Sequence, residues 1–152
     1  MISNLIIALN DGMQHLQIFR SIAICPGQSV RHDKTPIFVR ATPSFHGKEW
    51  YGNVTIKMEV GDEPERTSYG QLLLILKCEM QHGRTKVTKE LCLMHMYEEV
   101  GFDRLVNCPI LKWATNGTGS YLLIDSCRIL KAIHVVPNFV TEGYFFVNVF
   151  KF

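Results

Sequence analysis

Polar and apolar residues alternate with a period of two along several short stretches of this chain. The longest of these stretches covers residues 50–60, where Trp50 and Val54 fall on one side and Tyr51 falls on the other. Period two over this length is typical of a half-buried strand. The last stretch, residues 144–152 (YFFVNVFKF), consists almost entirely of residues that favour strands. The pattern therefore predicts a protein built mainly from strands.

Turn signals separate further short apolar runs at the spacing that all-β folds show. These runs cover residues 15–25, 36–41, 72–76, 87–97, 105–113 and 121–124. The two runs on either side of Gly83 predict a hairpin, in which this glycine supplies the permissive backbone of the loop. The run that contains Pro109 predicts a short edge segment, because proline cannot donate to a central ladder.

One short helix interrupts the series of strands. Asp125 or Ser126 is placed to cap one or two helical turns that end at Leu130 or Ala132. We expect residues 134–138 to lead from this helix to the last strand, and residues 98–104 to form a loop. The order of elements predicts a mainly β fold, a small β-barrel with one short helix near residues 126–132, and a compact sandwich is the alternative.

Length and composition set the scale of this fold. The chain has 152 residues, of which 47% are hydrophobic and 20% are charged, as in a globular domain with one core. We assign residues 15–152 to a single barrel-like domain and residues 1–14 to an N-terminal extension or edge strand. The apolar run at residues 5–9 is too short to span a membrane and lacks the features of a signal peptide, so no membrane partner is expected.

Positive charge is concentrated in the first third of the chain, although the formal net charge is only +2. Between residues 28 and 57 the cations are Arg31, Lys34, Arg40, Lys48 and Lys57, with His32 and His46 nearby, and the acids are Asp33 and Glu49. A solvated face with ordinary surface cations is one interpretation. The other is a patch that contacts the phosphates of DNA, and Arg31, Lys34, Arg40, His46 and Lys48 are its candidate residues.

Five cysteines are present, with no CxxC motif, and most of them sit in apolar runs where a free cysteine behaves as a small hydrophobe. This usage favours a reducing, intracellular compartment. Cys78 with His82 and Cys92 with His95 have spacings that zinc modules use. Cys92 and His95 stand three residues apart, however, so in a strand they point to opposite faces. We therefore predict no metal site.

A thiol enzyme is the catalytic alternative. Cys127 or Cys108 with His134, oriented by Asp125, offers the residue types of an activated nucleophile. The chain shows neither a nucleophile elbow nor a glycine-rich oxyanion loop, so no activating context is predicted. It has no glycine-rich phosphate-binding motif either, and no cofactor is expected.

Aromatic residues at strand ends suggest a second kind of binding site. Tyr51, Tyr97 and Trp113 are the candidates for stacking on bases or for caging a methylated ammonium group. Packing in the core is the alternative role for all three.

Several phrases of the chain, taken in order, carry a family resemblance. They are residues 38–47 (FVRATPSFHG), 69–74 (YGQLLL), 91–97 (LCLMHMY), 108–112 (CPILK), 124–139 (IDSCRILKAIHVVPNF) and 144–148 (YFFVN). This order resembles the C-terminal accessory domain of proteins encoded by fungal DNA transposons of the KDZ and CACTA-like kind. The resemblance covers the chain from His15 onward. His134, Pro137 and Asn148 match its pattern as determinants of the fold.

The resemblance implies a barrel of the bromo-adjacent homology (BAH) type, carried beside a transposase core whose catalytic carboxylates lie elsewhere. It implies a non-enzymatic nuclear module that contacts DNA or chromatin. The alternative is a structural docking domain for an upstream transposase core. A zinc- or thiol-dependent small enzyme is the remaining hypothesis, from a different class.

Overall fold

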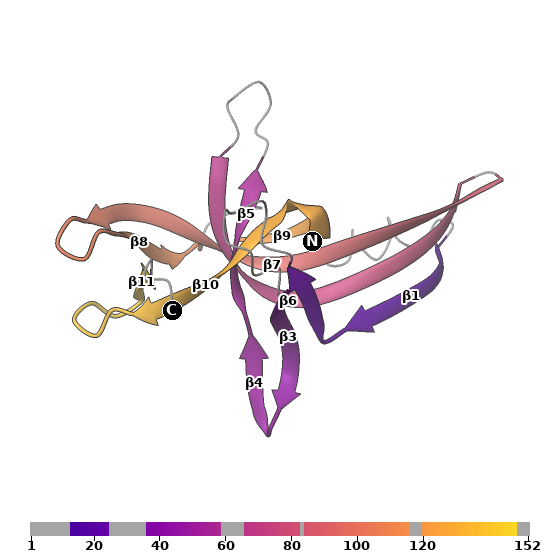
Figure 1. The fold of residues 1–152 in the computed structure, drawn as a ribbon. Coiled ribbons are helices and arrows are strands. Elements are labelled where there is room, and N and C mark those ends of the chain that lie inside the picture. The colour runs from indigo at the N-terminus through magenta and orange to yellow at the C-terminus, as the bar shows by residue number, and fades with distance from the viewer. Residues whose placement is uncertain (1–12, 25–35, 59–65, 83, 116–119, 149–152) are drawn as a thin grey trace.

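The computed structural model describes residues 13–24, 36–58, 66–82, 84–115 and 120–148. Most of these residues lie in strands, which confirms the mainly β prediction (Figure 1). The strands are β1 (Met13–Phe19), β2 (Ser21–Ile24), β3 (Ile37–Phe45), β4 (Lys48–Tyr51), β5 (Asn53–Met58), β6 (Arg66–His82), β7 (Thr85–Asp103), β8 (Cys108–Trp113), β9 (Tyr121–Asp125), β10 (Ile129–Pro137) and β11 (Tyr144–Asn148).

Antiparallel pairings join six of the strands in a ring. Strand β6 pairs with β5, β5 with β10, β10 with β11, β11 with β8, β8 with β7, and β7 with β6 again. The large sheet therefore curls round on itself, and the architecture is barrel-like. Such curling removes most of the unpaired strand edges that an open sheet would present.

The predicted hairpin is present as β6 and β7, but both strands are longer than the sequence indicated. Their pairing extends from Tyr69 opposite Tyr97 to His82 opposite Thr85, and the far half projects from the ring as an arm. Strand β1 pairs with β6 along this arm, and β9 pairs with the middle of β7. Gly83, the predicted loop residue, lies outside the described residues.

A second, small sheet contains β2, β3 and β4. Gly52 links the two sheets, because its N–H donates to the Arg40 carbonyl and its carbonyl accepts from the Leu72 N–H, both at 2.8 Å. The predicted strand at residues 50–60 divides at Gly52 into β4 and β5, so that β4 joins the small sheet and β5 the large one. A Cβ atom at Gly52 would lie 2.4 Å from Cγ1 of Val39, so only glycine permits this close passage. The β3/β4 hairpin extends away from the ring as a second arm (Figure 1).

The core has two parts, one on each face of the large sheet. One cluster gathers side chains of the large sheet and of the small sheet that packs on it, including Val54, Leu72 and Val39. The other centres on Tyr97, Leu111 and Val147. Alternation along β7 shows the division, because Met96 belongs to the first cluster and its neighbour Tyr97 to the second, and successive side chains of a strand point to opposite faces.

The helical prediction holds at the right place but at a smaller size. Residues 126–128 form a single 3-10 turn (Ser126–Arg128), and Asp125 caps it by accepting a hydrogen bond from the Cys127 backbone N–H at 3.2 Å. Ile129 already begins β10, so the stretch up to Ala132 is strand rather than helix. The β-branched residues Ile129, Ile133, Val135 and Val136 of this run favour the extended conformation.

Three further predictions were wrong because they depend on long-range strand pairing, which the local sequence does not reveal. Residues 98–104 were expected to form a loop, but β7 continues to Asp103 and pairs with β8. Residues 134–138 belong to β10 up to Pro137. Strand β8 is not an edge, because β7 and β11 both pair with it. Pro109 is tolerated there because the pairing with β11 begins one residue later, at Ile110.

The predicted extension at residues 1–14 is described only from Met13 onward, where β1 begins. Of the last predicted strand, the structure describes Tyr144 to Asn148. Within the described ranges, none of the helical segments is long and apolar enough to cross a membrane.

Candidate nucleic-acid interface

A tight two-residue turn closes the β3/β4 hairpin. His46 and Gly47 form the turn, with φ angles of 52° and 77°. Positive φ at both central residues marks a type I′ turn, whose twist matches that of the strands it joins. The turn fixes Phe45 opposite Lys48, and the exposed side chain of His46 projects from the tip of the arm.

A bulge in β3 decides which side chains share a face of this hairpin. Thr42 pairs with Trp50 and Phe45 pairs with Lys48, so β3 advances by three residues over the distance in which β4 advances by two. Residues directly opposite each other in a sheet point to the same side. The extra residue therefore brings Phe45 onto the same face as Thr42, whereas an unbroken strand would place it on the other face.

Local sequence chemistry explains the bulge. Pro43 has no N–H to give to the ladder, and the hydroxyl of Thr42 accepts a hydrogen bond from the Ser44 N–H at 3.3 Å. The same hydroxyl lies 3.2 Å from the Ser44 carbonyl oxygen, to which it donates. These two hydrogen bonds hold the bulged part of the β3 backbone in one conformation.

One face of the small sheet consequently carries aromatic rings and cations in sequence. We call it the hairpin face and define it by Phe38, Arg40, Phe45, Lys48 and Trp50. The register of β2 with β3 and of β3 with β4 places all five side chains on the same side. Glu49 lies between Lys48 and Trp50 in β4, so its carboxylate points to the opposite side.

The rings of the hairpin face hold one another in place. The guanidinium carbon of Arg40 lies 3.9 Å from the centre of the Phe45 ring, a cation–π contact. Phe45 meets Trp50 nearly perpendicularly, with centroids 5.3 Å apart, and meets His46 in the same way at 4.3 Å. Phe45 is thus the centre of the cluster and is half-buried by its neighbours.

Much of this face remains open to solvent. Trp50 is 51% exposed and Phe38 is 62% exposed. Among the described residues, no carboxylate forms an ion pair with Arg40 or Lys48. Exposed aromatic surface next to unpaired cations is the combination that binds nucleic acids through both bases and phosphates.

The structure brings three of the predicted site residues together, namely Arg40, His46 and Lys48. Arg31 and Lys34 lie outside the described residues. Tyr51 belongs to the same hairpin but points to the opposite side from Trp50. Sequence reasoning missed Phe38, Phe45 and Trp50, and the Thr-Pro-Ser sequence at residues 42–44 was the signal that could have revealed their shared face.

Tyr97 and Trp113 lie elsewhere, in a column of stacked rings. The rings of Tyr97 and Trp113 are 4.1 Å apart, Trp113 and His95 are also 4.1 Å apart, and His95 and Tyr121 are 4.5 Å apart. The Tyr97 hydroxyl donates a hydrogen bond to Asn53 Oδ1 at 2.9 Å. Rings in direct stacking contact leave no space between them for an ammonium group, so these two aromatics pack against each other, and Tyr51 is outside the column.

The thiols and imidazoles do not form a metal site in the described part of the chain. Cys78 pairs with Lys89 and Cys92 pairs with Ile75, so the two thiols lie on opposite faces of the β6/β7 hairpin. Cys92 and His95 diverge as predicted, because Cys92 packs in the core and His95 joins the ring column. The side chain of His82 is outside the described set.

The same thiols have pKa values that oppose nucleophilic activation. Burial raises the pKa of Cys78 and of Cys108, and burial next to acidic side chains raises the pKa of Cys92 to about 12. Cys127 is exposed, but the hydrogen bond from its thiol to Asp125 raises its pKa as well. A nucleophilic cysteine needs a lowered pKa, which these environments do not supply.

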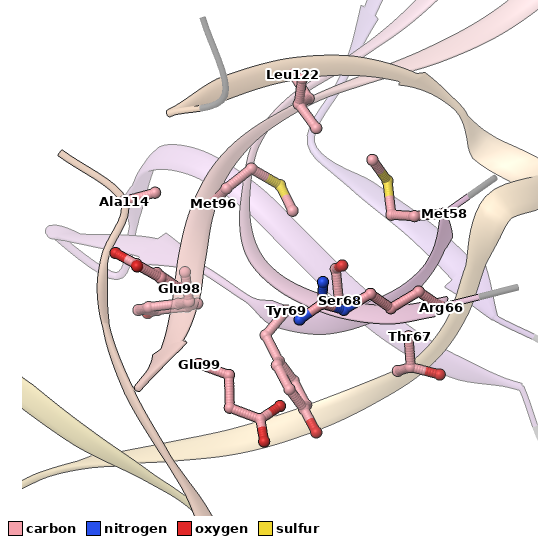
Figure 2. A pocket seen from close by; sticks show the side chains of 11 residues that line it. Met58, Arg66, Thr67, Ser68, Tyr69, Met96, Glu98, Glu99, Ala114 and Leu122 are labelled. Atoms are coloured by element: carbon pink, nitrogen blue, oxygen red, sulfur yellow. The ribbon is translucent and has the colours of Figure 1, made fainter. Parts of the chain in front are cut away.

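A hollow of about 460 Å³ opens where β6 and β7 diverge. Its lining is mixed: Figure 2 shows Met58, Met96 and Leu122 gathered on one side and Tyr69 with Glu99 on the other. Burial, and then the nearby Glu99 carboxylate, raise the pKa of Tyr69. Lys112 pairs with Glu98 at 3.3 Å and offsets part of the negative charge there. Among its described lining residues there is no cysteine or histidine.

Comparison of the chain with protein-family models, with curated proteins and with solved structures gave no match.

Proposed function

We propose that this domain is a non-enzymatic interaction module that contacts DNA through the hairpin face. The observation that carries this proposal is the gathering of Arg40, Lys48, Phe45 and Trp50 on one side of a projecting hairpin, with Glu49, the acid in the same strand, on the other side. Cations contact phosphates, and exposed aromatic rings can stack on bases.

The wider setting of the proposal comes from the sequence resemblance. In that setting the domain is a BAH-like accessory module of a protein from a fungal DNA transposon, acting on DNA or chromatin in the nucleus. Free thiols at Cys78, Cys92, Cys108 and Cys127 are consistent with such a reducing compartment. The raised pKa values of these thiols favour a binding role over a thiol-dependent reaction.

The test is binding of the purified chain to a generic DNA duplex across a salt series. We expect affinity to fall as salt rises, because cations that neutralise phosphates release counterions. The double variant Arg40→Glu/Lys48→Glu should lose binding. The matched control is Lys89→Glu/Lys131→Glu, in which two exposed lysines of other strands are reversed. Each reversal subtracts two charges, so both double variants have a formal net charge of −2 instead of +2. Equal loss in both would show that only net charge matters and would contradict a defined face.

A docking role is the second candidate, and two exposed turns favour it. Leu105, Phe139 and Val140 are 96%, 91% and 95% exposed. Both turns are nevertheless held firmly: the Asp103 carboxylate accepts from the Leu105 N–H at 2.8 Å, and Asn138 Oδ1 accepts from the Val140 N–H at 2.9 Å. Exposed apolar side chains that gather into one patch are typical of protein contact sites.

Docking would be tested by co-elution with a transposase core of the same element. Replacing Leu105, Phe139 and Val140 by serine should abolish co-elution, while Arg40→Glu/Lys48→Glu should leave it intact. If the unmodified domain does not co-elute, the docking candidate is wrong.

A further inference from the structure

We propose that the hairpin face binds nucleic acid in single-stranded form, with an unpaired base stacked on Trp50 and the neighbouring phosphates at Arg40 and Lys48. This inference rests on the proposed DNA-contacting function and specifies the form of nucleic acid that the same face selects.

The indole of Trp50 is both fixed in place and accessible. Phe45 contacts it with an interplanar angle of 84°, so the two rings do not stack on each other. Trp50 keeps 51% of its surface exposed. By contrast, the Arg40 guanidinium covers the Phe45 ring at 3.9 Å, so Phe45 orients the cluster while Trp50 remains available to a ligand.

Aromatic and charged side chains alternate along the hairpin face. Following the face from β2 toward the turn, Phe38 comes first, then Arg40, then Trp50, and then Lys48. Phe38 and the position paired with Trp50 are four residues apart along β3, or roughly 13 Å. A single strand has the same alternation, since each base is followed by a phosphate. The order of side chains therefore matches the chemistry of a single strand laid along the hairpin.

A duplex fits the same face less well. Its bases are stacked on one another, so their flat surfaces are closed to Trp50 and Phe38. Groove reading relies on hydrogen-bonding side chains at base edges, whereas the exposed part of this face is mainly aromatic. A protein that makes about 6–10 phosphate contacts on a duplex needs a matching number of cations. Among the described residues, the hairpin face has two cations that form no ion pair with a carboxylate, Arg40 and Lys48.

The test compares an oligothymidine of about 12 nucleotides with a duplex of equal length, read by tryptophan fluorescence and by anisotropy of a labelled strand. We expect the single strand to bind more tightly and to quench Trp50. Trp113, the other tryptophan, is stacked between His95 and Tyr97, so a Trp50→Phe variant should bind with little quenching. With two phosphate contacts, the slope of log affinity against log salt should be about −1.4.

Variants at the aromatic positions separate stacking from charge. Trp50→Ala should weaken single-strand binding about 5- to 100-fold, in line with the loss of one stacked base, while Trp50→Phe should keep most of the affinity. Because Trp50 is half-exposed, circular dichroism should show that both variants fold. Tighter binding to the duplex, or no quenching on binding, would overturn the single-strand inference and leave the DNA-contacting function standing. Absence of binding to either form would overturn both.

Discussion

At the scale of single residues, burial determines which side chains are chemically available. Cys92 is fully buried, and its pKa of about 12 keeps it a neutral thiol at ordinary pH. Trp50, four residues beyond the tip of its hairpin, is half-exposed in spite of its size. The thiols of Cys78, Cys92 and Cys108 are thus buried, whereas Trp50 is open to solvent. This contrast supports the proposed binding role at the scale of single residues.

The buried thiol predicts a decline of stability at alkaline pH. Cys92 has a higher pKa in the folded chain than its ordinary value of 9.0, so the folded state keeps the proton over the range in which the unfolded state loses it. Its contribution is fully present below pH 9 and is lost as the pH rises toward 12. The free energy of unfolding should therefore fall between these limits, by at most about 1.4 kcal/mol per pH unit for one such group.

Urea unfolding at a series of pH values between 7 and 10.5 would measure this decline. Tyr69, Cys78 and Cys108 have raised pKa values too and add to the decline in the same direction. The difference between the unmodified chain and Cys92→Ala isolates the one thiol. We expect that difference to shrink above pH 9, and a constant difference would refute the assignment.

At the scale of elements, the β3/β4 hairpin depends on its turn and on its bulge. Gly47 has a φ of 77°, and no atom lies within 4 Å of the Cβ that a substitution would add. Glycine is therefore required at this position by the positive φ angle and not by lack of space for a side chain. Gly143, in the turn before β11, has a φ of 79° and equally open surroundings. The two glycines form a matched pair in different arms of the molecule.

Gly47→Val should disrupt the register of the hairpin and weaken DNA binding at least tenfold, because Phe45 and Lys48 would no longer be held opposite each other. Gly143→Val places the same strain in the β10/β11 turn and should leave DNA binding within about twofold. Anisotropy titrations of the two variants, with circular dichroism as a check on folding, make the comparison. Equal effects would mean that the turn of the hairpin has no special part in binding.

Much of the element order could be predicted from sequence, for identifiable reasons. Period-two alternation revealed the strand around Val54, and the residues beside Gly83 revealed the β6/β7 hairpin. The cap at Asp125 was also visible, although the helix it starts is only one turn long. The division at Gly52 was hidden, because it depends on the close approach of Val39 from another strand.

The candidate site was less accessible to sequence reasoning than the fold. Arg40, His46 and Lys48 were found through their charge. Trp50 was expected on the same side as buried Val54, since unbroken alternation leads to that result. The break at Gly52 and the bulge before Phe45 each shift the alternation by one residue, so that the side chains beyond them lie on the other face. The amino-acid composition does not reveal such a shift.

At the scale of the whole molecule, side chains from several strands of the ring pack together inside it. Leu111 lies in β8, is fully buried, and packs with Tyr97 and Val147 from other strands. Leu105 lies in the turn before β8 and is 96% exposed. These two leucines, six residues apart, allow the contribution of the core to be compared with that of the surface for the same side chain.

Leu111→Ala should lower the free energy of unfolding by about 2–5 kcal/mol, because it removes buried methyl groups and leaves a cavity. Leu105→Ala should change it by less than about 0.5 kcal/mol. Chemical denaturation followed by far-ultraviolet circular dichroism and by tryptophan fluorescence would measure both. If Leu111→Ala cost no more than Leu105→Ala, the ring interior would not be the packed core described above.

The bulge in β3 has a consequence for how this arm tolerates changes in length. Whether Phe45 shares a side with Trp50 depends on the parity of the residue count between their strands, and Pro43 and Ser44 set that parity. Insertions or deletions of an even number of residues there preserve the surface that the arm presents. An odd number would place Phe45 on the opposite face from Trp50, although the side chains already present stay the same. Which side chains share a face of the arm thus depends on the number of residues in the bulge, not on which residue types the arm contains.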